Sequence, residues 1–134
     1  MPLVLMLEDN PTDLRQAADI AGRAGFTEFE VCRFVGDARH YLEKAKSGTV
    51  PLPDAMILDL DLGVESGFEI VRMWHGTPQL KPIPVILWTV FGNHEREMSE
   101  LFGIYRFVSK EDGPQPLFEA LTGLIGGIGT PKVG

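Results

Sequence analysis

Short apolar runs separated by amphipathic stretches constrain the fold of this chain more than any other feature of its sequence. Each run is nearly continuous in apolar residues, as in parallel strands that are covered on both faces. The pattern therefore predicts an α/β domain with a doubly wound parallel sheet. The five expected strands are 3–7, 29–32, 55–60, 83–89 and 105–108.

The stretches between the runs predict five helices in alternation with the strands. The first begins at Asn10 and Pro11, a capping side chain followed by proline at the first helical position, and it ends near Gly22 or Gly25. Five strands and five helices suit the flavodoxin-like (βα)5 arrangement with strand order 2-1-3-4-5, in which ligands lie at the carboxyl ends of the strands. The other helices are expected at about 38–45, 66–74, 94–102 and 114–125.

Length and charge limit the domain organisation and the partners. The 134 residues predict one domain, 1–125, followed by a flexible tail, 126–134. A formal net charge of −7 would repel phosphate backbones and anionic lipids, so neither nucleic acid nor a membrane is an expected partner. The apolar amino-terminal run is too short for a signal peptide or a span, which predicts a cytoplasmic protein. Cys32 is the only cysteine, so no internal disulfide can form.

Acidic residues follow two of the predicted strands, at the edge where a ligand is expected. Glu8 and Asp9 follow the first strand, and Asp59 and Asp61 lie at the end of the third. Any one of them could be a solvated loop residue. Carboxylates that converge repel one another unless a hard cation neutralises them, and Mg²⁺ prefers a few carboxylate oxygens together with waters and a phosphate oxygen. Their joint placement predicts a metal and an anionic substrate.

A hydroxyl and an ammonium are expected at the same edge. Thr89 ends the fourth strand, and Lys110 follows the fifth. Taken alone, a threonine after a strand is usually a turn residue and a lysine is usually a solvated charge. Because both groups can bind phosphate oxygens, beside the carboxylates they complete a predicted phosphoryl site.

From residue 3 to residue 125 the sequence resembles the receiver domain of two-component response regulators. The residues that carry the resemblance are Glu8-Asp9, Leu58-Asp59-Leu60-Asp61-Leu62, Gly67, Ile83-Pro84-Val85-Ile86-Leu87-Trp88-Thr89, Phe107 and Lys110. The resemblance implies a single-domain response regulator, a phosphoacceptor switch rather than an enzyme. A sensor histidine kinase or a phosphotransfer protein would supply the phosphoryl group. The segments 53–59 and 80–85 look like the single-domain receivers that serve phytochrome-type sensor kinases.

The resemblance assigns roles to the residues at the acidic edge. Asp59 would accept the phosphoryl group as a carboxylate nucleophile. Glu8, Asp9, Asp59 and the backbone carbonyl of Asp61 would hold Mg²⁺. Both the metal and Lys110 would neutralise charge on the transferring oxygens.

A second set of roles concerns signal transmission. Thr89 would reach a phosphoryl oxygen, and its movement would vacate space that Phe107 can fill. This switch would alter the surface of the fourth helix, fifth strand and fifth helix. A downstream protein, or a second copy in a homodimer, would bind that surface.

Some residues depart from the receiver pattern, and two alternatives stay open. The departures are Gly63, Ser66, Val90 and Glu111; Val90 could crowd the phosphoryl pocket, and Glu111 replaces a proline, which puts a cis peptide there in doubt. One alternative is a degenerate receiver that docks without phosphorylation. The other is a haloacid-dehalogenase-like phosphatase, since Asp59-Leu60-Asp61 also fits that family's DxD motif. That family usually carries DxD after its first strand and in a longer chain, so we rank it below the receiver.

Overall fold

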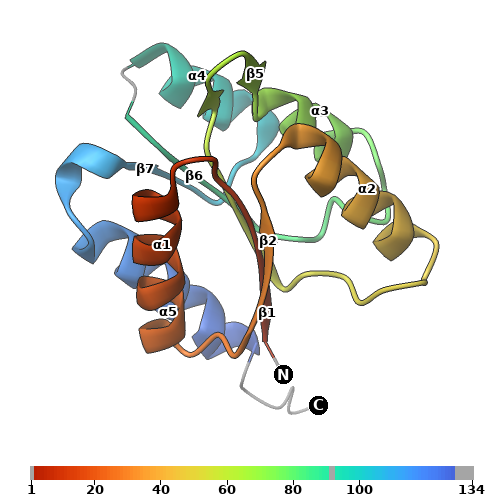
Figure 1. Ribbon diagram of the computed structural model, residues 1–134, viewed down its shortest axis with the longest axis horizontal. Coiled ribbons are helices and arrows are strands. Elements are labelled where there is room, and N and C mark those ends of the chain that lie inside the picture. Colours follow the sequence, from red (N-terminus) through yellow and green to blue (C-terminus); the bar gives the residue numbers. More distant parts are fainter. Residues whose placement is uncertain (1, 91–92, 129–134) are drawn as a thin grey trace.

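The computed structural model describes residues 2–90 and 93–128, and these form a parallel sheet with helices on both faces (Figure 1). The strands of this sheet are β1 (Leu3–Leu7), β2 (Glu28–Cys32), β3 (Ala55–Leu58), β6 (Val85–Thr89) and β7 (Arg106–Ser109). The helices are α1 (Pro11–Ala24), α2 (Val35–Lys46), α3 (Phe68–His75), α4 (Asn93–Phe102) and α5 (Gln115–Ile128), with a short 3₁₀ helix, η1 (Lys110–Asp112), before α5.

The strand order is β2-β1-β3-β6-β7, and every neighbouring pair is parallel. Numbered along the chain within this sheet, the order is 2-1-3-4-5, which confirms the predicted flavodoxin-like arrangement. The direction of winding reverses between β1 and β3. In a sheet of this kind the carboxyl ends of these two strands border the crevice in which ligands bind.

The strands bury alternate residues on opposite faces, and β1 shows this most clearly because all five of its residues are buried. Leu3, Leu5 and Leu7 belong to the core under α2 and α3, which also contacts the end of α4. Val4 and Met6 belong to the core under α1 and α5. Figure 1 shows the same division, with α1 and α5 on one face and α2, α3 and α4 on the other.

Helix α1 begins where the sequence predicts. The side chain of Asn10 accepts hydrogen bonds from the backbone N–H groups of Thr12 and Asp13, at 2.9 and 3.0 Å, and Pro11 occupies the first helical position. Gly25 ends the helix with φ 119°, a conformation that favours glycine. The capped first turn therefore stands directly after the acidic residues that follow β1.

The third strand is shorter than predicted and is followed by a hairpin that the apolar pattern did not reveal. The paired register of β3 with β1 and with β6 ends at Leu58. The hairpin joins β4 (Asp61–Leu62) to β5 (Glu65–Ser66), with Gly63 at φ 75° in its turn. Leu60 and Leu62 are buried in the core under α2 and α3, which explains why apolar residues continue past the strand.

Other boundaries differ by a few residues. Strand β6 begins at Val85 rather than at residue 83, and β7 covers Arg106–Ser109 rather than 105–108. Helix α3 begins at Phe68, whose N–H donates to the hydroxyl of Ser66 at 3.2 Å. Helix α5 continues to Ile128, beyond the domain end predicted at residue 125, and the rest of the predicted tail, 129–134, lies outside the described residues.

Candidate functional site

The predicted site residues meet at one edge of the sheet because each lies at the carboxyl end of a parallel strand. Glu8 follows β1, Asp59 follows β3, Thr89 ends β6 and Lys110 follows β7. The backbone extends the sheet pairing to the acidic positions: the N–H of Glu8 donates to the carbonyl of Cys32, and that of Asp59 donates to the carbonyl of Leu7, both at 3.0 Å. The two carboxylates therefore project from a rigid part of the fold.

Three carboxylates form a group that fits a hard cation. One oxygen from each of Glu8, Asp9 and Asp59 lies within 4.8 Å of the other two. Glu8 and Asp59 are almost fully buried, with 3% and 4% of their surface exposed, so water does little to relieve their mutual repulsion. Such a set of oxygen donors suits Mg²⁺.

Asp61 lies beside this group, but its carboxylate does not belong to it. Its backbone N–H donates to Oδ1 of Asp59 at 3.1 Å, and its own Oδ1 accepts from the N–H of Gly63 at 3.3 Å. The side chain is exposed. Among the described residues, the Asp61 carboxylate is therefore not one of the three that could share a cation.

The ammonium of Lys110 pairs with three carboxylates at once. Its Nζ lies 2.6 Å from Oε1 of Glu8, 2.8 Å from Oδ2 of Asp13 and 3.0 Å from Oδ2 of Asp59. Burial opposes the charged form, but the hydrogen bonds that Lys110 donates to Asp13, Glu8 and Asp59 outweigh it and raise the pKa of Lys110. Lys110 is therefore a fixed positive charge beside Asp59. Among the described residues no peptide bond is cis, including the one that joins Lys110 to Glu111.

For Glu8, in contrast to Lys110, the surroundings disfavour the charged form. Its burial raises its pKa to about 7, and the negative charge of Asp59 acts in the same direction, while the hydrogen bond from Lys110 acts against both. The direction is physically reasonable because three carboxylates share one ammonium. Glu8 is thus a carboxylate whose ionised form is favoured by any further positive charge at the site.

Two buried polar groups at the end of β6 lack a hydrogen-bond partner among the described residues. They are the hydroxyl of Thr89, in a residue with no exposed surface, and the indole N–H of Trp88. Buried hydroxyls are nearly always paired, so an unpaired one at the edge of an acidic, lysine-bearing site suggests a ligand oxygen. Lys110 Nζ also lies 5.0 Å from the centre of the Trp88 ring.

Gly67 holds the loop after Asp59 in place. A Cβ atom at this position would overlap the backbone carbonyl oxygen of Asp59, and it would also lie 3.0 Å from the carbonyl carbon. The N–H of Gly67 donates to the carbonyl of Leu60 at 3.2 Å, which fixes the close approach. The glycine that carried part of the sequence resemblance is therefore required by the backbone geometry around Asp59.

Phe107 lies on β7, which β6 separates from β3 and Asp59, and it pairs with Leu87 of β6. Its ring is partly buried against the core under α2 and α3. The guanidinium of Arg96 on α4 lies 5.2 Å from the ring centre. Val90, which was expected near the phosphoryl pocket, is 47% exposed.

Asp13 is the residue at this site that the sequence did not single out. It occupies the first turn of α1, where an acidic residue is ordinarily explained by the favourable interaction with the helix dipole. Only the folded structure shows that its carboxylate reaches Lys110, which is 97 positions away in the chain. No spacing rule connects two positions so far apart.

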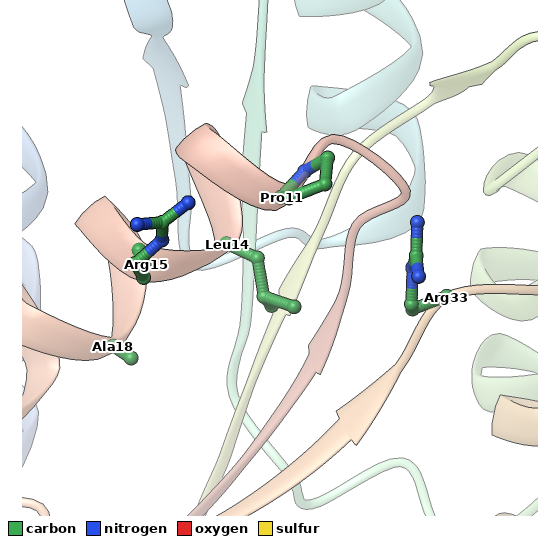
Figure 2. A pocket seen from close by; sticks show the side chains of 5 residues that line it. All are labelled: Pro11, Leu14, Arg15, Ala18 and Arg33. Atoms are coloured by element: carbon green, nitrogen blue, oxygen red, sulfur yellow. The ribbon is translucent and has the colours of Figure 1, made fainter.

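A groove borders the site between α1 and the segment after β2, and Figure 2 shows the five residues that line it: Pro11, Leu14, Arg15, Ala18 and Arg33. Its volume is about 300 Å³. The guanidinium of Arg33 donates to the backbone carbonyl of Asp9 at 3.3 Å, which joins the groove to the acidic residues. The lining is apolar between the two arginines.

Fold and site together define a class of protein: the chain has the receiver-domain fold of response regulators, which confirms the resemblance seen in the sequence. No family model and no curated protein matches the chain. None of the helices in the described part of the chain is long and apolar enough to cross a membrane.

The particular structures to which it is similar are response regulators and a receiver domain. The bacteriophytochrome response regulator AtBRR is 28% identical, with a TM-score of 0.74 and 92% of each chain covered. The signal receiver domain of a histidine kinase from Syntrophus aciditrophicus is 25% identical, with a TM-score of 0.77, and the comparison covers 100% of this chain and 98% of that one. The Mn²⁺-bound form of response regulator Rcp1 is 23% identical, with a TM-score of 0.76 and the same coverage.

Proposed function

We propose that this protein is a single-domain response regulator of a two-component phosphorelay, in which Asp59 accepts a phosphoryl group with the help of Mg²⁺. The observation that carries the proposal is the surroundings of Asp59. Its buried carboxylate lies 3.0 Å from the Lys110 ammonium, within a three-carboxylate group that fits a hard cation. The unpaired Thr89 hydroxyl at the same edge supports a phosphoryl oxygen as the missing partner.

The residues of the chain divide the chemistry among them. A carboxylate oxygen of Asp59 attacks phosphorus, the bond to the donor's leaving group breaks, and the leaving group keeps the electron pair. The Lys110 ammonium and the Thr89 hydroxyl donate hydrogen bonds to the phosphoryl oxygens. Mg²⁺ held by Glu8, Asp9, Asp59 and the Asp61 carbonyl supplies charge neutralisation on those oxygens when bound. The chain acts as a phosphoacceptor, and its own activity is limited to self-phosphorylation and autodephosphorylation.

The signal leaves through a change of packing. When the Thr89 hydroxyl turns to the phosphoryl group, the space beside it becomes available to Phe107, whose ring is only partly buried. Arg96 of α4 stacks over that ring, so a movement of Phe107 reaches the surface formed by α4, β7 and α5. A downstream protein, or a second copy in a homodimer, binds that surface.

The phosphodonor is a sensor histidine kinase or a phosphotransfer protein, and the setting is the cytoplasm. The similarity to AtBRR, a bacteriophytochrome response regulator, supports a phytochrome-type sensor kinase. The apolar groove beside Asp9 offers such a protein a contact next to Asp59 (Figure 2). The net charge of −7 disfavours nucleic acid and anionic membranes as partners.

Incubation with acetyl phosphate and Mg²⁺, followed by intact mass measurement, tests the proposal. The protein should gain one phosphoryl group, EDTA should prevent the gain, and Asp59→Asn should not be labelled. Catalytic release of p-nitrophenol from p-nitrophenyl phosphate, without stoichiometric labelling, would instead identify a phosphatase. No labelling at all would favour a receiver that docks without phosphorylation.

A second measurement concerns the switch. Beryllofluoride mimics an acyl phosphate, so NMR spectra of the protein with and without it should differ at Thr89, at Phe107 and along α4. Shifts confined to the loops around Asp59 would contradict this route of transmission, because the Phe107 ring would then be a static part of the core.

A further inference from the structure

Lys110 has three carboxylate partners, and one of them differs from the other two. Glu8 and Asp59 belong to the group that fits a cation, whereas Asp13 lies outside that group. Asp13 is also the more exposed, since 29% of its side chain is accessible compared with 4% for Glu8 and for Asp59. Among the described partners of Lys110, Asp13 is therefore the one that is neither a proposed metal ligand nor the proposed phosphoacceptor.

Lys110 has only as many N–H donors as it has carboxylate partners, so it cannot keep all three contacts and also bind a phosphoryl oxygen. An ammonium has three N–H donors, and here three carboxylates accept from it. A phosphoryl oxygen would be a fourth acceptor, so Lys110 must give up one contact to reach it. The proposed function takes the Asp59 carboxylate as the nucleophile and Glu8 as a metal ligand, which leaves the contact with Asp13 as the one that can persist.

Asp13 is held firmly enough to act as an anchor. It stands in the capped first turn of α1, where its backbone N–H donates to the Asn10 side chain at 3.0 Å. The next residue, Leu14, packs against the core under α1 and α5. The carboxylate therefore projects from a fixed turn toward Lys110, whose own side chain is only 11% exposed.

We propose that Asp13 is a positioning residue that holds the Lys110 ammonium beside Asp59, so that Lys110 meets the transferring phosphoryl group from a fixed place. The inference rests on the proposed function and deepens it. Without Asp13, the partners left to Lys110 among the described residues are the two carboxylates of the candidate metal site. Its ammonium would then be drawn toward Glu8 and away from the position from which it serves the phosphoryl oxygens.

Labelling kinetics test this role with variants matched in charge. Asp13→Asn should slow labelling by acetyl phosphate at saturating Mg²⁺ by about tenfold, which lies within the loss of up to about 100-fold that a misplacement of about 1 Å can cause. Asp19→Asn is the control: it removes the same charge from the same helix, where Asp19 pairs with the exposed Arg23 at 3.0 Å. Asp13→Glu should restore part of the rate. In a Lys110→Ala background, Asp13→Asn should have no further effect.

An NMR signal reports the position of Lys110 without any phosphorylation. The chain has two tryptophans, so few indole N–H signals are expected. Lys110 Nζ lies 5.0 Å from the centre of the Trp88 ring. The indole N–H of Trp88 has no hydrogen-bond partner among the described residues. In the metal-free protein, Asp13→Asn should shift this indole resonance, and Asp19→Asn should leave it in place. Trp88→Phe identifies the signal.

The outcomes separate this inference from the proposed function. Indole spectra of Asp13→Asn that match the wild type would overturn it, as would an unchanged labelling rate or a rate effect that persists without Lys110. If the wild type is never labelled, the proposed function fails, and so does the role in phosphoryl transfer; the indole shift then shows only whether Asp13 fixes Lys110. If the wild type is labelled normally and Asp13→Asn has no effect, the role of Asp13 is wrong and the proposed function stands.

Discussion

Thr89 combines complete burial with a hydroxyl that has no hydrogen-bond partner among the described residues. Leaving a buried polar group unpaired costs a folded protein about 1–3 kcal/mol. Sites that bind ligands commonly retain such a cost, since the ligand supplies the missing partner. At this residue, stability of the unphosphorylated protein and binding of a phosphoryl group are therefore expected to oppose each other.

Replacing Thr89 with valine should change stability and binding in opposite directions. Thr89→Val removes the unpaired hydroxyl at nearly constant shape, so the free energy of unfolding in urea should rise by about 1 kcal/mol. Beryllofluoride binding in the presence of Mg²⁺ should weaken. Thr122→Val serves as a control, because the Thr122 hydroxyl donates to the carbonyl of Glu119 at 3.0 Å. A destabilised Thr89→Val variant would show that the hydroxyl is paired in the folded protein.

Gly67 gives a second prediction at the scale of one residue. In Gly67→Ala the new methyl group would meet the carbonyl of Asp59, and the loop would have to shift at a cost of about 1–3 kcal/mol. Labelling of Asp59 should fall as well. Gly36→Ala is the matched control, since a Cβ there has nothing within 4 Å and α2 should gain slightly from alanine. Equal stabilities of the two variants, measured by urea denaturation, would contradict the close approach.

The site residues that could be predicted from the sequence share one property: each lies at the end of a strand. The strand ends of a parallel sheet meet at one edge, so the sequence alone was enough to place Glu8, Asp59, Thr89 and Lys110 together. It was not enough for Asp13, because the partner of that residue is set by how α1 packs relative to β7. The interaction with the helix dipole already explains an aspartate in the first turn of α1. The sequence therefore gives no reason to expect that Asp13 also pairs with Lys110.

Lys81 is one of the residues that tie the end of helix α4 to the rest of the fold, where the Phe102 ring also packs against Phe68 and His75. Nζ of Lys81, in the segment before β6, donates to the carbonyl of Phe102 at 3.0 Å and lies 3.9 Å from the Trp74 ring centre. A cation at the carboxyl end of a helix satisfies a free carbonyl and interacts favourably with the helix dipole. The end of α4 is thus held to α3 through Lys81 and Trp74.

Removing this contact should loosen α4. Lys81→Met should lower the free energy of unfolding by about 1–2 kcal/mol, the combined scale of a charged hydrogen bond and a cation–π contact. Hydrogen exchange should accelerate most at the end of α4. Lys46→Met, which breaks only an exposed pair with Glu43 at 3.3 Å, should change stability by less than about 0.5 kcal/mol. Exchange that increases uniformly over all helices would contradict a local role.

The main strands and helices follow from their hydrophobic patterns, but the hairpin of β4 and β5 does not. Residues 55–60 are apolar except for Asp59, although strand pairing stops at Leu58. Leu60 is apolar because it is buried in the core under α2 and α3, although it is not paired in the sheet. Periodicity reports burial, and the same burial can arise from a strand or from a packed loop.

Cys32 reports on the core under α2 and α3, and so on the folding of the chain. Its thiol is 1% exposed, and burial raises its pKa to about 12, with the charges of Glu30 and Asp37 acting in the same direction. The folded protein therefore keeps this proton at a pH where the unfolded chain loses it. Folding should lose stability as the pH rises from about 9 to about 12.

Thiol alkylation measures this protection. Below that range Cys32 should react on the order of 10³-fold more slowly in the folded protein than in urea, since reaction requires opening of the fold. The rate should follow the denaturant dependence of unfolding. A folded protein that reacts as quickly as the unfolded chain would place the thiol at the surface.

Mapping the modified residue shows whether Asp59 carries the phosphoryl group. The protein is incubated with acetyl phosphate and Mg²⁺ and then treated with borohydride, which reduces an acyl phosphate of aspartate to homoserine. Mass spectrometry of the peptide that contains residues 55–62 should find homoserine at Asp59 and at no other aspartate. Homoserine at another position, or none in a protein shown to be folded, would contradict the account.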